Sequence, residues 1–184
     1  GQKPGASFNA MSKATVNTIE GDFRPVIVSD CLFCVDRQTG QTRWLYRNGC
    51  ILNNGIMIDA ESAESDRCIY LLESRNEKAM GNDRGRIRLD EFFAEGVRLL
   101  ALRLADGSVV WERPVALPYQ HIAYLNGSRG VLLATGTYNK GNEVWYGLYA
   151  FDMKTGGDKW QTPYRALDNR STDNFAEIDG SHGE

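Results

Sequence analysis

The sequence has 184 residues, with 21 lysines and arginines against 24 aspartates and glutamates, and a formal net charge of −3. We expect no nucleic-acid partner, because such binders usually carry an excess of basic groups. No apolar run reaches the roughly 18 to 20 residues of a membrane-spanning helix, so we expect no membrane-spanning segment. The 19 glycines and the 10% aromatic content favour many short strands joined by turns.

Strand and turn signals predict an all-β fold that follows an irregular N-terminal segment, residues 1–23. A first set of four strands is predicted at residues 51–58, 68–73, 97–104 and 109–113. A second set is predicted at residues 122–125, 130–136, 145–151 and 158–162. Within the second set, Asn126-Gly127 is a signal for a hairpin turn.

An internal repeat indicates that these strands form similar units along the chain. Residues 32–44, 99–111 and 148–160 align without gaps, and each copy holds a small residue, a glycine six positions later and a tryptophan four positions after that. The small residues are Cys34, Ala101 and Ala150; the glycines are Gly40, Gly107 and Gly156; the tryptophans are Trp44, Trp111 and Trp160. The three tryptophans are 67 and 49 residues apart, and a repeat period of about 50 residues indicates stacked supersecondary units.

Each copy has the pattern of a β-hairpin. The glycine supplies the positive φ that a tight turn requires, and the strand that leaves the turn ends in a tryptophan. One hairpin cannot bury so large a side chain, so each tryptophan is expected to pack on a neighbouring unit. On this reasoning Trp160→Ala is expected to cost about 3–5 kcal/mol.

The composite motif resembles the blade repeat of the pyrroloquinoline-quinone-like (PQQ-like) β-propellers. Ala150, Asp152, Thr155-Gly156 and Trp160 follow the family pattern of a small residue, an acid, Thr-Gly and Trp. The first copy differs from it by a cysteine in place of the usual alanine. The second copy differs more, with Arg103 in place of the acid and Asp106 in place of the threonine.

The resemblance implies blades of four antiparallel strands, about three of them, in an incomplete ring. Residues 24–184 then form a propeller segment, with a part blade at 24–47, whole blades at 50–113 and 119–163, and the start of another at 175–184. Because the family closes its ring with about six to eight blades, we expect either a segment of a longer protein or the assembly of several chains. We favour the segment.

Two functions are compatible with this resemblance. The first is a non-catalytic scaffold, like the outer-membrane assembly lipoproteins of bacteria, which binds a protein partner or the remaining blades and needs no cofactor. The second is a quinone-dependent dehydrogenase, which would hold PQQ and Ca²⁺ on the propeller axis. Enzymes of that type carry two adjacent cysteines, which this sequence lacks, so we favour the scaffold. The resemblance implies a place outside the cytoplasm, in the bacterial periplasm or cell envelope.

A charged insertion, residues 73–95, interrupts the first whole blade. It is either a loop that contacts a partner or covers the channel, or a variable insertion that Phe92 and Phe93 pack onto its own blade. We favour the second interpretation, since long surface insertions are well tolerated.

The sequence contains few candidates for a metal-binding or catalytic site. An acidic turn, residues 59–66, could collect Ca²⁺ but lacks the offsets of a calcium hand, so a solvated turn is favoured. His182 lies close to Asp179 and Glu184 and forms with them the one candidate site, whereas His121 is expected within a strand. We expect no catalytic and no metal-binding residues.

The four cysteines give no metal site. Cys31 and Cys34 form a C-x-x-C that no second pair or histidine cluster completes, and Cys34 fits the small-residue position of the repeat. Cys50 and Cys68 fall on adjacent predicted strands and are candidate cross-strand neighbours.

Overall fold

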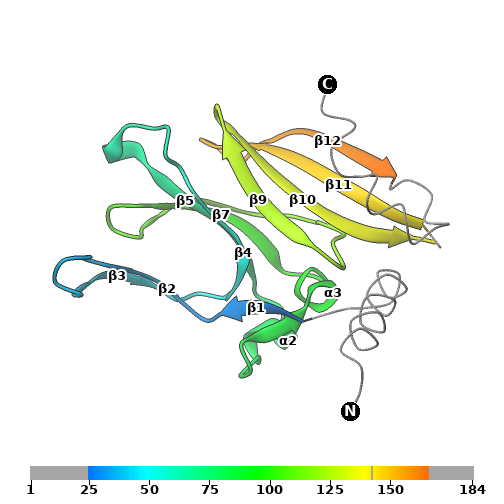
Figure 1. Cartoon of the computed structure of the whole chain (residues 1–184), viewed down its shortest axis with the longest axis horizontal. Coiled ribbons are helices and arrows are strands. Elements are labelled where there is room, and N and C mark those ends of the chain that lie inside the picture. Colours follow the sequence, from blue (N-terminus) through cyan, green and yellow to red (C-terminus); the bar gives the residue numbers. More distant parts are fainter. Residues whose placement is uncertain (1–24, 142, 166–184) are drawn as a thin grey trace, which may run out of the picture.

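A computed structural model describes residues 25–141 and 143–165, and these residues form an all-β fold with propeller-type blades (Figure 1). The strands are β1 (Pro25–Ser29), β2 (Leu32–Val35), β3 (Thr42–Tyr46), β4 (Cys50–Ile58), β5 (Cys68–Ser74), β6 (Arg86–Arg88), β7 (Val97–Arg103), β8 (Val109–Pro114), β9 (Ala123–Ser128), β10 (Val131–Lys140), β11 (Glu143–Asp152) and β12 (Asp158–Arg165). Short helical turns occur at Glu64–Asp66 (η1), Glu77–Met80 (α2) and Leu89–Phe92 (α3).

Two sheets contain the four-stranded units that the sequence indicates. In the first, β4, β5, β7 and β8 pair in this order, and in the second β9, β10, β11 and β12 do so. All of these pairs are antiparallel, and each strand pairs with the next one in its unit. We refer to these two units as blade A (β4, β5, β7, β8) and blade B (β9–β12). The described strands do not close into a ring.

The first repeat forms a separate hairpin, β2–β3, which lies beside blade A in Figure 1. The preceding strand β1 does not pair with β2. It joins the inner edge of blade A instead, where it pairs with β4 on one side and with β6 on the other. The part blade expected at residues 24–47 is therefore represented by the β2–β3 hairpin alone.

The hairpin turn between β9 and β10 is not where the sequence indicated. Asn126-Gly127 lies within β9, and the chain turns at Arg129-Gly130, with φ of +51° and +75°. Two consecutive residues with positive φ are typical of a type I′ turn. Gly127 serves packing, since a Cβ atom there would lie 2.6 Å from the terminal methyl of Met57 in blade A.

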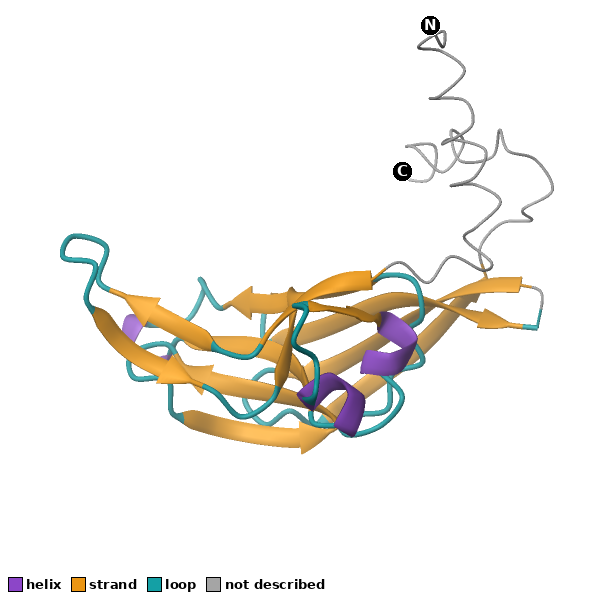
Figure 2. Cartoon of the chain, turned by 90° about the horizontal axis from the view of Figure 1, so that it is seen from below, coloured by secondary structure: helices purple, strands orange, loops and turns teal. Residues whose placement is uncertain are grey.

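The insertion is folded down onto blade A, as the favoured interpretation predicted. Phe92 and Phe93 are buried in the main core, and the Phe93 ring meets the Tyr119 ring edge to face with centroids 5.3 Å apart. Figure 2 shows the two short helices α2 and α3 close together beside the sheets. Within the insertion, β6 extends the sheet of blade A beyond β1.

Asn76 organises the insertion from its first turn. Its side-chain oxygen accepts the Ala79 N–H at 2.8 Å and so caps α2. Its amide donates to backbone carbonyls at the far end of the insertion, including that of Glu91 at 2.9 Å. A single buried side chain thus ties the beginning of the insertion to its end.

Two apolar layers hold the units together. The smaller layer lies between the β2–β3 hairpin and blade A, and its buried members are Trp44, Tyr46, Ile51, Ile69, Leu71, Leu100 and Leu102. The larger layer joins blade A, the insertion and blade B, and includes Leu72, Leu99, Phe92, Tyr119 and Phe151. Alternation along β7 sends Leu99 into one layer and Leu100 into the other, as a strand buried on both faces requires. Among the described residues, no helix is both long and apolar enough to span a membrane.

Candidate interaction site

Two junctions between neighbouring units share one geometry. The Trp44 indole N–H donates to the carbonyl oxygen of Leu104 at 3.0 Å, and the Trp111 indole N–H donates to that of Met153 at 3.0 Å. Each accepting carbonyl lies three residues before the repeat glycine of the next unit. The indole of one unit therefore lies on the turn of the following unit.

The glycine at each junction is required for two reasons. Gly107 and Gly156 have φ of +72° and +71°, a region that side-chain-bearing residues rarely adopt. A Cβ atom at Gly107 would also lie 2.7 Å from the Trp44 ring, and one at Gly156 would lie 2.7 Å from the Trp111 ring. Conformation and contact together make any side chain at these positions costly.

The small residue of each repeat lies opposite its tryptophan. Cross-strand pairing matches Cys34 with Trp44, Ala101 with Trp111 and Ala150 with Trp160. Paired residues of antiparallel strands have Cβ atoms about 5 Å apart on one face of the sheet. A small side chain at this position leaves the indole room beside it.

An aspartate side chain holds each repeat turn, although the aspartate does not always occupy the same repeat position. Asp36 accepts the backbone N–H groups of Gln38 and Thr39, and Asp152 accepts those of Lys154 and Thr155 in the same way. These hydrogen bonds lower the pKa of both aspartates, that from the Thr39 N–H most for Asp36 and that from the Thr155 N–H most for Asp152.

In the second copy Arg103 replaces the acid, and Asp106 takes over its role. The Asp106 carboxylate accepts the Ser108 N–H at 2.9 Å and the Ser108 hydroxyl at 2.6 Å. The departure of this copy from the repeat pattern is thus compensated within the same turn.

Trp160 corrects the expectation that every repeat tryptophan is buried. It is 49% exposed, whereas Trp44 is 8% exposed. Its indole makes no hydrogen bond within the described residues, since no following turn lies against it there. The Gly40 turn, conversely, lacks an indole, because no residue that the structure describes lies within 4 Å of the position that a Gly40 Cβ atom would take. Within the described residues, the stack therefore has an unpaired tryptophan at one end and an unpaired glycine turn at the other.

Blade B also carries exposed aromatic side chains on the face that contains Trp160. The registers place Tyr124 opposite Thr135, and Tyr164 opposite Tyr146, on this same face. Tyr124 and Tyr164 are 47% and 55% exposed. We call this surface, made of Tyr124, Tyr146, Trp160 and Tyr164, the aromatic face.

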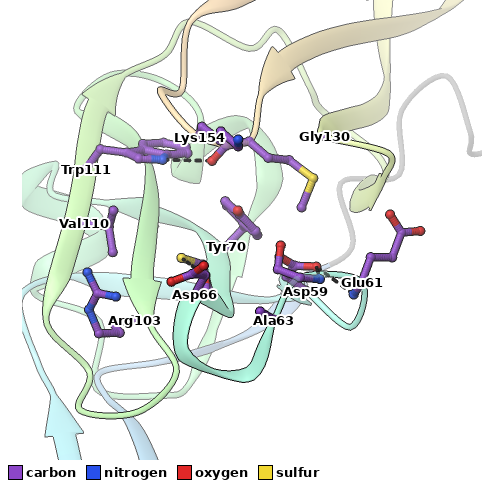
Figure 3. A pocket seen from close by; sticks show the side chains of 13 residues that line it. Asp59, Glu61, Ala63, Asp66, Tyr70, Arg103, Val110, Trp111, Gly130 and Lys154 are labelled. Atoms are coloured by element: carbon purple, nitrogen blue, oxygen red, sulfur yellow. Dashed lines mark hydrogen bonds between the residues drawn. The ribbon is translucent and has the colours of Figure 1, made fainter.

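A pocket of about 430 Å³ opens between blades A and B (Figure 3). Tyr70 and Trp111 form its apolar wall, with ring centroids 5.9 Å apart. Its rim carries charged side chains of both signs. The carboxylates belong to the β4–β5 loop, and the positive groups are those of Arg103 and Lys154. The pocket belongs to the junction itself, since Trp111 reaches across it to Met153.

The carboxylates of this pocket serve as structural acceptors. Asp59 accepts the N–H groups of Glu61 and Ser62, and Glu61 accepts the Arg129 N–H at 2.7 Å and the Ser128 hydroxyl at 2.9 Å. Burial would raise the pKa of Asp59, but the hydrogen bonds from Ser62 and Glu61 outweigh it and lower that pKa. The backbone N–H of Arg129, followed by the Ser128 hydroxyl, lowers the pKa of Glu61. Both groups are ionised at neutral pH, so neither can act there as a general acid.

A buried acid braces the first junction, and sequence reasoning missed it. Glu73 is fully buried, accepts the Tyr46 hydroxyl hydrogen at 2.7 Å and is paired with Arg75. Arg75 continues to Glu112 on β8, at 3.0 Å. This network links the β2–β3 hairpin to β5 and to the outer strand β8 of blade A, and a buried network whose members are all paired makes the junction rigid. The available signal was a glutamate at the end of the otherwise apolar segment 68–73.

The remaining sequence candidates do not form a site in the described residues. His182, Asp179 and Glu184 lie outside the described residues. His121 lies before β9 rather than within a strand, with its Nε2 atom 3.1 Å from Asn139 Oδ1. Across residues 25–141 and 143–165, no group of three or more metal-ligating side chains is found, so the acidic turn at 59–66 does not gather into one.

The four cysteines are free thiols. Cys50 pairs with Ser74 and Cys68 with Arg103, so the two cysteines lie at opposite ends of the β4–β5 pair and the expectation of a cross-strand neighbour was wrong. Burial raises the pKa of the Cys50 thiol to about 11, with Glu73 adding to the effect.

Comparison with known proteins finds similarity to solved structures only. No family model and no curated protein matches the sequence. Among solved structures, BamB from Moraxella catarrhalis is similar, with a TM-score of 0.42 and 19% sequence identity. The similarity covers 80% of this chain and 36% of that protein, so the chain spans about a third of the length of the protein that it matches.

Proposed function

We propose that this chain is a non-catalytic segment of a PQQ-like β-propeller and acts as a rigid scaffold that binds protein. The observation that carries the proposal is the aromatic face of blade B, where Trp160 and Tyr164 of β12 are both about half exposed. Exposed clusters of large aromatic side chains mark protein interaction surfaces, and tryptophan and tyrosine dominate binding energies there.

The chemistry of the partner follows from the two junctions inside the chain. An indole of this repeat binds a turn that has a glycine under the ring and a carbonyl oxygen three residues earlier. The proposed partner therefore presents a β-sheet with an apolar face and a glycine turn at its edge. Stiffness favours such binding, because the braced stack loses little conformational entropy when it associates.

Affinity capture with paired variants tests the proposal. The chain, Trp160→Ser and Ile58→Ser would each be immobilised and exposed to extract from the source cells. Ile58 is a matched control, since it is an exposed apolar residue on β4 in blade A, away from the aromatic face. We expect a protein that binds the parent chain and Ile58→Ser, binds Trp160→Ser at least about tenfold more weakly, and does the same when purified. Partners that are indifferent to Trp160 would contradict the proposal.

The proposal requires no cofactor, and a spectroscopic titration separates it from the dehydrogenase alternative. PQQ and Ca²⁺ would be added to the chain, followed by desalting and an absorption spectrum. A scaffold is expected to retain no quinone. A stoichiometric bound chromophore would favour the enzyme and overturn the proposal.

A location in the bacterial periplasm or cell envelope is part of the same proposal and rests on the family resemblance of the repeats. Fractionation of the source cells, followed by detection with an antibody against the chain, tests it. Recovery of the protein in the cytoplasmic fraction would contradict this location.

A further inference from the structure

The geometry points to a second copy of this chain as an occupant of the aromatic face, with Trp160 of one copy on the Gly40 turn of the next. This inference rests on the proposed function, because it names a partner for the same surface. Its basis is that the two ends of the stack carry the two halves of one junction.

The Gly40 turn has the structure of a turn that already receives an indole. Gly40 and Gly156 share a φ of +71°. In each turn the glycine N–H donates to the carbonyl of the aspartate four residues earlier, at 2.8 Å for Gly40 and 2.7 Å for Gly156. The two turns differ in what covers them, since Trp111 lies on Gly156, whereas none of residues 25–141 and 143–165 fills the space above Gly40. By the same offset, the carbonyl of Arg37 would accept the Trp160 indole N–H.

The apolar surface around the Gly40 turn matches this assignment. Aligned by the repeat, Phe33 and Val35 correspond to Leu100 and Leu102. The two leucines are buried against the preceding unit, at 0% exposure, whereas Phe33 and Val35 are 60% and 45% exposed. The hairpin therefore exposes the side chains that at both internal junctions face a preceding unit. Phe33, Val35, Leu45 and the Gly40 turn together form what we call the receiving face.

The aromatic face and the receiving face lie at opposite ends of the stack. Contact between them is heterologous, since each copy would use a different surface on either side. Such an interface closes into a ring where the rotation between copies permits, and otherwise extends into a filament. Each copy added in this way repeats the order found within the chain, with a tryptophan on the glycine turn of the next unit.

Two variants that each disable one half of the junction test the inference. Trp160→Ser removes the donor, and Gly40→Asn fills the space above the turn while keeping a residue that tolerates positive φ. Gly130→Asn is the matched control, because Gly130 also has a positive φ, of +75°, and open space at its Cβ position. Circular dichroism and urea midpoints establish that each variant is folded.

We expect the 184-residue chain and Gly130→Asn to associate with increasing concentration in sedimentation velocity experiments. Each disabling variant alone is expected to associate at least about tenfold more weakly. An equimolar mixture of Trp160→Ser and Gly40→Asn is expected to form a 1:1 dimer and nothing larger, because one intact donor meets one intact turn. Only a heterologous junction predicts that two defective variants complement each other.

Three results would overturn the inference. They are a parent chain that stays monomeric, association that survives in both disabling variants, and a mixture that forms no dimer. If the chain is monomeric while a different protein binds in a Trp160-dependent manner, the second copy is excluded and the proposed function stands. If neither form of binding depends on Trp160, both fail.

Discussion

Substitution of two repeat tryptophans by alanine should have unequal costs, although the sequence repeat treats them as equivalent. A tryptophan buries about 150–250 Å², which at roughly 25 cal/mol per Å² corresponds to about 4–6 kcal/mol. Trp44 is 8% exposed and donates a hydrogen bond to Leu104, so Trp44→Ala should cost about 3–5 kcal/mol after relaxation. Trp160 is 49% exposed, so Trp160→Ala should cost no more than about half of that figure, about 2–3 kcal/mol.

Urea unfolding followed by circular dichroism measures this difference. The protein must be dilute, because association through Trp160 would add to its apparent stability. Similar denaturant slopes for both variants would show that the comparison concerns the same transition. Equal losses of unfolding free energy would refute the account of the junction, since they would mean that contact with a following glycine turn contributes nothing.

Three further predictions concern the turns, the buried acid and the insertion. Gly107→Ala should cost about 2–5 kcal/mol from positive φ and overlap with Trp44, whereas Gly40→Ala should cost only the φ term, about 1–2 kcal/mol, in urea unfolding. Burial and the neighbouring Glu73 raise the pKa of Tyr46 from 10.0 to about 12. The contribution of the protonated Tyr46 hydroxyl to the free energy of unfolding should therefore be complete below pH 10 and lost as pH rises toward about 12. Tyr46→Phe should therefore be about 1–3 kcal/mol less stable at neutral pH and show a smaller further loss over that window. Asn76→Ala should accelerate amide hydrogen exchange in residues 77–96, and Asn76→Asp should protect α2 while leaving the far end of the insertion loose.

Local signals predicted the strands of both blades well. Each predicted strand of blades A and B overlaps an observed one, because alternating apolar residues and glycine turns act within a few positions of each other. The misplaced turn in blade B shows the limit of such signals. Asn126-Gly127 has the stronger turn composition, but pairing of Gly127 with Leu132 places the bend at Arg129-Gly130.

The parts that sequence could not give depend on contacts between distant segments. A glutamate at the end of a strand is expected to be exposed to solvent, but Glu73 is buried. Its contacts with Tyr46 and Arg75 offset the free-energy cost of burying the carboxylate. For Trp160 the prediction from sequence is wrong in the opposite direction. Its repeat position predicts burial, but the side chain is 49% exposed because no described unit packs on that face of blade B. Pairing partners, rather than residue type, decide both cases.

The glycine and the tryptophan are constant in the three repeats, as is the first leucine (Leu32, Leu99 and Leu148), and at the two internal junctions the glycine and the tryptophan each serve two requirements at once. The glycine must adopt positive φ and also lie against an indole, and the indole must fill that space and also donate to a carbonyl of the same turn. The turn aspartate has only one task, to accept backbone N–H groups. It can therefore move, as Asp106 does when Arg103 occupies its usual position. A position with two simultaneous constraints has no substitute elsewhere in the turn, so the Gly–Trp pair identifies a junction even where the rest of the motif has changed.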